Sequence, residues 1–239
     1  MKSARAIFIK QAKDTLKNRM VLIQFIIFPV MAFVMTEFIA KGQPDIPNSL
    51  YVTMFAAMFA GMTPLTMTSG AISEDRERKS LRFLVMAGVK PYEYLLGIGG
   101  FVLVMCSLIS VIFGLIGGFS GMELFKFVSV LILGSIASAI LGATIGIFSK
   151  NQQSATAIST PVFMLLSFSP LIAMFNESVK KFVGIFYTQH VNNIVNAGGF
   201  LSDPDQAADP LKSYLIIAAN IAVLLVLFFV AYKKKGLRD

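Results

Sequence analysis

The sequence predicts an all-α membrane protein with six transmembrane helices, and three observations support this fold class. Apolar residues make up 56% of the 239 residues and charged residues 14%, whereas a soluble domain carries about 25% charged residues. The charged residues gather in short segments. Between them lie six apolar runs of at least about 18 residues, the length that crosses a bilayer as a helix. We therefore expect a single transmembrane domain over residues 1–239.

The expected elements follow in order along the chain. Residues 3–18 place basic side chains on one helical face and apolar ones on the other, which predicts an amphipathic helix in the headgroup layer. The spans are expected at about 20–39, 50–72, 94–118, 124–149, 155–175 and 215–232. Between spans 5 and 6, residues of about 178–202 are too polar to cross. We expect them to dip into the outer leaflet and return, buried by other helices.

Basic residues predict the orientation of the chain. With the N-terminus inside, the inner segments hold 16 of the 21 Lys and Arg residues, and the outer segments hold Lys41, Lys126, Lys180, Lys181 and Lys212. The positive-inside rule then places both ends in the cytoplasm, in a multi-pass protein of the cell membrane. The net charge of +8 is explained by these flanking groups next to membrane lipid, so we expect no nucleic-acid partner.

Residue types that carry enzyme chemistry are scarce. His190 is the only histidine and Cys106 the only cysteine, so a site of several His or Cys ligands for a metal is impossible. No Gly-x-x-x-x-Gly-Lys-Ser/Thr loop is present to bind phosphates, so any ATP chemistry must come from another chain. We expect no enzyme activity, no metal and no cofactor in this chain.

The spans also lack ionisable residues at mid-depth, where a proton- or sodium-coupled carrier would place Asp, Glu or His. This disfavours a secondary carrier or channel without excluding it, because backbone carbonyls can coordinate ions. A membrane scaffold or immunity protein that transports nothing is a third alternative.

Spans 2 and 5 combine apolar and hydroxyl side chains. Such a lining suits an amphipathic or lipid-like cargo better than a small ion, although simple helix packing explains the same residues equally well. The residues predicted to line a substrate path are Met62, Thr63, Thr66, Phe163, Met164 and Ser167.

The charged segment after span 2 carries the most specific pattern. Leu81, Leu84, Val85 and Gly88 fall on one helical face, which predicts a short amphipathic helix over residues of about 77–88. A helix of this kind at the membrane surface is a docking element for a partner protein. An ordinary charged loop that fixes topology is an equal alternative on this pattern alone.

This segment resembles a signature of the ABC type-2 exporter permease family, in which an acidic residue, Arg and Glu are followed by x-Gly-Thr-Leu. Asp75-Arg76-Glu77 match its beginning, Ser80-Leu81 match Thr-Leu, and Leu84 matches a later leucine. Lys79 stands where the pattern usually has Gly. The order of the amphipathic helix, six spans and polar outer segment is similar over the whole chain.

The resemblance implies a transmembrane subunit that pairs with a second copy or a paralogue. It also implies a separate cytoplasmic ABC ATPase, which binds ATP and Mg and drives export of a drug, peptide or lipid by alternating access. Coupling to that ATPase would involve Asp75, Glu77, Arg78, Ser80, Leu81, Leu84 and Gly88.

Overall fold

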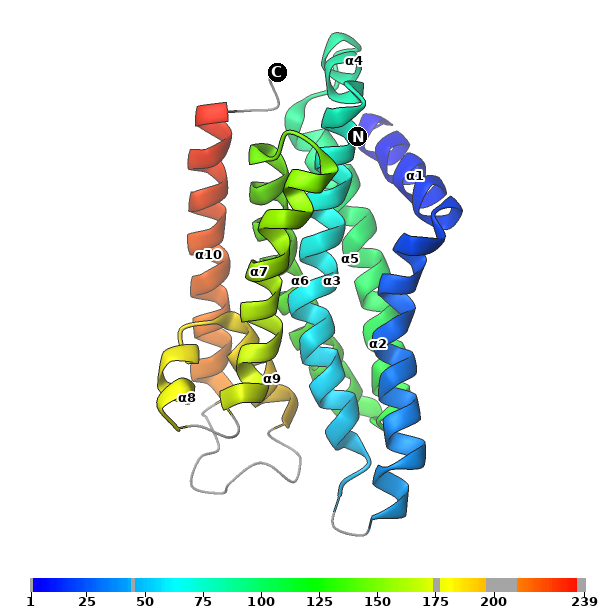
Figure 1. Ribbon diagram of the computed structural model, residues 1–239, viewed down its shortest axis with the longest axis vertical. Coiled ribbons are helices and arrows are strands. Elements are labelled where there is room, and N and C mark those ends of the chain that lie inside the picture. Colours follow the sequence, from blue (N-terminus) through cyan, green and yellow to red (C-terminus); the bar gives the residue numbers. More distant parts are fainter. Residues whose placement is uncertain (1, 44–45, 174–176, 197–209, 236–239) are drawn as a thin grey trace.

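The computed structural model describes residues 2–43, 46–173, 177–196 and 210–235. Within these residues it is all-helical, and six helices are long and apolar enough to cross a membrane. They run side by side along the long axis of the molecule (Figure 1). The predicted fold class is therefore confirmed. The six helices are α2 (Arg19–Phe38), α3 (Ser49–Glu77), α5 (Pro91–Ile116), α6 (Gly121–Phe148), α7 (Gln152–Ala173) and α10 (Pro210–Lys235).

Short helices lie at the two ends of this bundle. The helices α1 (Lys2–Lys17) and α4 (Ser80–Met86) lie at the same end as the last turn of α10. The 3₁₀ turn η1 (Ala40–Gly42) and the helices α8 (Glu177–Val183) and α9 (Tyr187–Asn196) lie at the opposite end (Figure 1). We refer to these as the α4 end and the α9 end.

The helices α3 and α6 form the centre of the molecule. In each, 67% of the most apolar window is buried, compared with 22% in α2 and 17% in α10. Small residues of α6 allow this close packing, since a Cβ added to Gly142 would lie 2.3 Å from the Leu65 carbonyl oxygen.

A hydrogen bond between α3 and α6 compensates for Pro64 within α3. Proline has no N–H, so the carbonyl of Ala60, four residues earlier, loses its donor within the helix. The hydroxyl of Ser138 on α6 donates to this carbonyl at 2.5 Å and lies 2.6 Å from the Tyr187 hydroxyl. A polar residue in the centre of the bundle thus satisfies a backbone group that the sequence of α3 leaves open.

The helix α1 packs against the protein with part of its apolar face. Ile7 is buried, and a Cβ on Gly97 of α5 would lie 2.7 Å from its side chain. The ring of Phe8 lies edge-on to Phe101, with centroids 5.6 Å apart. The predicted place of this helix in the headgroup layer remains a prediction.

The helix expected over residues of about 77–88 is shorter at both ends. The helix α3 continues to Glu77, and α4 begins only at Ser80. The chain turns at Lys79, whose φ of 57° is left-handed, and α4 ends before Gly88 with φ of 77°. The apolar spacing indicated a helix, but it carries no information on this break, which depends on backbone conformation.

The helix α9 packs inside the bundle at the α9 end. The helix α9 contacts α3, α6, α7 and α10, and Gln189, His190 and Asn192 are buried. The His190 ring nitrogens lie 3.2 Å from the Ser213 hydroxyl and 2.9 Å from the Gly184 carbonyl. Residues 197–202 of the predicted re-entrant segment lie outside the described residues, and its depth in a membrane remains a prediction.

Candidate functional site

Asp75 joins four helices at the α4 end. Its side chain is 7% exposed and forms an ion pair with Lys10 of α1. It also accepts hydrogen bonds from the Tyr94 hydroxyl of α5 at 2.9 Å and from Ser80 of α4 at 3.2 Å. Lys10 is 43% exposed, so solvent screens the ion pair, and the hydrogen bonds from Tyr94 and Ser80 stabilise the buried carboxylate. Asp75 therefore holds α4 firmly against α1, α3 and α5.

The neighbouring charged residues connect α3 to α6 and α7. Arg76 donates to the carbonyl of Ile147 near the end of α6. A carboxylate oxygen of Glu77 accepts from the backbone N–H of Gln152 at 3.0 Å, at the first turn of α7, where a negative charge is favourable. Arg78 forms an exposed ion pair with Glu74 at 2.7 Å. The end of α3 is thus bonded to the beginning of α7.

The helix α4 has one face packed inward and one exposed. Leu81 is buried and Leu84 is partly buried in a cluster with Ile7, Ile72 and other apolar residues. Phe83 and Met86, three residues apart, are 65% and 66% exposed. Sequence analysis missed these two residues, although their spacing places them on one face, because it identified only the face that packs inward.

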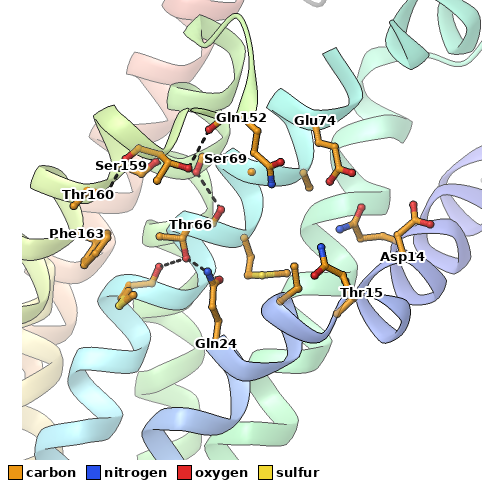
Figure 2. A pocket seen from close by; sticks show the side chains of 18 residues that line it. Asp14, Thr15, Gln24, Thr66, Ser69, Glu74, Gln152, Ser159, Thr160 and Phe163 are labelled. Carbon is orange, nitrogen blue, oxygen red and sulfur yellow. Dashed lines mark hydrogen bonds between the residues drawn. The ribbon is translucent and has the colours of Figure 1, made fainter. Parts of the chain in front are cut away.

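A polar cavity lies between α1, α2, α3 and α7, and Figure 2 shows the side chains around it. Its volume is about 190 Å³. On one side, Ser69 and Ser159 join α3 to α7 through hydroxyls 2.9 Å apart. On another, Thr66 donates to the Gln24 side chain of α2 at 3.4 Å. Eighteen residues line the cavity: Gln11, Asp14, Thr15, Asn18, Val21, Gln24, Met62, Thr66, Met67, Ser69, Gly70, Ala71, Glu74, Gln152, Thr156, Ser159, Thr160 and Phe163.

Comparison with known protein families identifies the family of this chain. Residues 4–232 match the family described as ABC-2 family transporter protein. This chain belongs to the ABC-2 transporter family. A comparison with curated proteins finds no significant match. The match covers almost the whole chain, including α4 and the cavity, so the protein is a multi-pass membrane subunit of an ABC transporter.

The turn at Lys79 explains why the permease signature usually has Gly at this position. Lys79 has a left-handed φ of 57°, a conformation that glycine adopts without steric cost. The permease signature usually has Gly at this position, and this chain keeps the turn with Lys instead. Ser80 supports the turn by donating to the Asp75 carbonyl at 3.1 Å.

Three of the predicted path residues of this ABC-2 protein meet in the cavity. Met62 and Thr66 line it from α3, and Phe163 lines it from α7. Sequence analysis missed the residues from α1 and α2, because it considered spans 2 and 5 alone. The polar residues Gln11, Asp14 and Gln24 could have been noticed beside these spans only with knowledge of how α1 packs against α5 and α2.

The other three path residues lie elsewhere. Thr63 is buried and lies 3.4 Å from the Gln24 carbonyl, to which it donates. Ser167 is buried and donates to the Met58 carbonyl at 3.2 Å. Met164 is 51% exposed. The structure therefore does not bring these three residues to the cavity.

Proposed function

We propose that this chain is the membrane subunit of an ATP-driven exporter for amphipathic or apolar substrates, and that its α4 end faces a cytoplasmic ATPase subunit. The membership of the ABC-2 family supports a transport role. The observation that carries the coupling role is the exposed pair Phe83 and Met86 on a helix whose other face is anchored.

The anchoring of α4 supports transmission of force from the ATPase to the spans. Leu81 packs in a cluster that includes Ile98 of α5, Ile147 of α6 and Phe228 of α10. Asp75 adds polar bonds to α1 and α5. A displacement of α4 would therefore move several spans together, since densely packed interiors transmit strain.

Glu77 supplies a second connection, from the end of α3 to α7. Its hydrogen bond to the Gln152 N–H directly joins two helices that both line the cavity. We infer that ATPase closure moves α3 and α4 and that this bond transmits the movement to α7. Alternating access in a dimer, with a second copy or a paralogue, would follow from this movement.

The test is a charge placed on the exposed face of α4. Met86→Asp and Phe83→Asp should abolish co-purification with the ATPase subunit and lose at least 90% of permease-dependent ATP turnover, because an apolar contact is replaced by a charge. The measurement uses the full complex in detergent or nanodiscs, with insertion of the variants followed by monodisperse size-exclusion profiles.

Met122→Asp is the matched control. Met122 is 67% exposed at the first turn of α6, at the α9 end, where an acidic side chain suits the helix terminus. This variant should keep full turnover. Wild-type turnover in both α4 variants would remove this helix from the mechanism, and a chain that never recruits an ATPase would favour a carrier or a scaffold.

A further inference from the structure

A second pocket lies beside the polar cavity, at the elbow where α1 is followed by α2 (Figure 1). Its volume is about 390 Å³, within the roughly 300–1,000 Å³ of sites for small molecules. Every residue that lines this elbow pocket is charged or an amide, so the pocket suits a polar or charged group. The lining residues are Asp14, Lys17, Asn18, Arg19, Glu74 and Arg78.

The elbow pocket has more cations than carboxylates, since three Lys and Arg side chains face two acidic ones. Glu74 is paired with Arg78 at 2.7 Å, and Asp14 lies 4.0 Å from a lysine of its own helix. Lys17 and Arg19 are exposed, and neither forms an ion pair with any residue that the structure describes. These two cations are therefore available to an anion. Arginine binds a phosphate through two parallel hydrogen bonds, and lysine binds it as a point charge.

An apolar stripe on α2 continues from the elbow pocket. Arg19 is followed at helical spacings of four, three and four residues by Ile23, Ile26 and Val30, which places them on one face. The three apolar side chains are 52%, 52% and 48% exposed. An exposed apolar face on a helix that spans a bilayer contacts acyl chains. A cationic pocket followed by an apolar stripe matches the two parts of a phospholipid in their order.

We propose that the elbow pocket binds the phosphate of an anionic phospholipid, with Lys17 and Arg19 as its counter-charges. One acyl chain of this lipid lies along Ile23, Ile26 and Val30. The excess of cations selects an anionic headgroup, because basic residues at a membrane surface attract anionic lipids and repel the cationic group of a zwitterionic one. The site does not depend on the proposed transport function.

The experiment measures lipid binding to the full-length chain, released from detergent, by native mass spectrometry. Phosphatidylglycerol is the anionic probe, and phosphatidylcholine with the same acyl chains is the zwitterionic comparison. The wild type should bind phosphatidylglycerol at least about fivefold more tightly, the effect of one basic residue at a membrane surface. Lys17→Gln with Arg19→Gln should bring the two affinities together. Arg78 is left unchanged, because it belongs to the segment predicted to contact the ATPase.

Two control variants accompany this pair. Lys126→Gln with Lys212→Gln removes two exposed cations at the α9 end and should keep the preference for phosphatidylglycerol. Lys17→Arg with Arg19→Lys exchanges the side chains without changing the charge and should also keep it. Equal binding of the two lipids by the wild type would overturn the proposal. So would an unchanged preference in the glutamine variant of the elbow, or an equal loss in the variant of the α9 end.

Glycerol 3-phosphate separates a lipid site from a site for a soluble anion. It carries a phosphate without acyl chains, so it cannot contact the stripe on α2. At the same concentration it should leave phosphatidylglycerol bound. Displacement of the lipid by glycerol 3-phosphate would mean that the pocket takes a soluble anion, and it would overturn the lipid assignment. Because no ATPase is present, each of these results leaves the proposed transport function standing.

Discussion

The two sides of α3 differ in how they meet their neighbours. Toward α6, glycine allows the backbones to touch, since a Cβ on Gly142 would lie 2.3 Å from the Leu65 carbonyl. Toward α1, α2 and α7, the same helix borders a cavity of about 190 Å³, which is lined by hydroxyl, amide and carboxylate side chains.

The difference indicates that the α3–α6 interface is rigid and that the α3–α7 interface can open. The α3–α6 contact involves backbone atoms, so separating or sliding these helices removes dense packing all at once. The α3–α7 contact beside the cavity depends on side-chain hydrogen bonds such as Ser69 to Ser159, each worth about 0.6 kcal/mol on average between membrane helices. We therefore expect α3 and α6 to move as one body, and α7 to follow them through the Glu77 bond at the α4 end while the hydroxyl contacts beside the cavity open.

Gly142→Ala should give the largest loss of stability among the variants that test this difference. The added methyl meets the Leu65 backbone, which cannot rotate away, so the variant should lose about 2–4 kcal/mol of stability, within the range of severe overpacking. Thermal unfolding in detergent measures it. Gly99→Ala in α5 is the control, because nothing lies within 4 Å of its Cβ position. Equal midpoints for the two variants would show that α3 and α6 are loosely joined.

Ser138→Ala should give the next largest effect, about 1–3 kcal/mol, because it leaves the Ala60 carbonyl without a donor. Adding Pro64→Ala restores an N–H within α3 and should recover part of this loss. A double-mutant cycle on the unfolding free energy measures the coupling. Strict additivity would contradict the compensation between Pro64 and Ser138.

Gly61→Ala tests the opposite side of α3 with the same chemical change. Its Cβ would lie 2.8 Å from the Ser167 hydroxyl, which can rotate, so the loss should be about 1 kcal/mol, the low end for overpacking. Thermal unfolding again measures it. Adding Ser167→Ala makes space and should reduce the loss. A cost as large as that of Gly142→Ala would remove the distinction between the two sides.

Lys79→Gly should give the smallest effect, and it should change neither the α3–α6 nor the α3–α7 interface. Relief of the left-handed conformation should stabilise the protein by about 0.5–1 kcal/mol, partly offset by the greater freedom of glycine in the unfolded chain. A small rise in the unfolding midpoint with unchanged ATPase association is the expected result. A fall in the midpoint would mean that the Lys79 side chain makes a stabilising contact.

Sequence alone predicted the fold class because hydropathy decides it. The runs that include Phe59 and Phe113 are long and nearly free of charge, and apolar runs of this length indicate helices that cross a bilayer. The helix break at Lys79 was not predictable from apolar spacing, because the periodic pattern begins only at Leu81, beyond the turn.

The candidate site was predictable only in part. Helical spacing assigns the residues of α4 to two opposite faces. Only the packing shows that the face with Leu81 is buried and the face with Phe83 is exposed. The cavity depends on α1, which packs against α5 and α2 and brings Thr15 into one cavity with Thr66 from distant parts of the chain. One sequence contains no signal for such a pairing.

The length of α3 has a mechanical consequence. Its 29 residues form one helix, which at a rise of 1.5 Å per residue is a rod about 43 Å long. If the rod pivots at one end by about 5°, simple geometry on that length moves the other end by nearly 4 Å. A small rotation imposed at Asp75 would thus be amplified by leverage into a displacement of this size at the far surface.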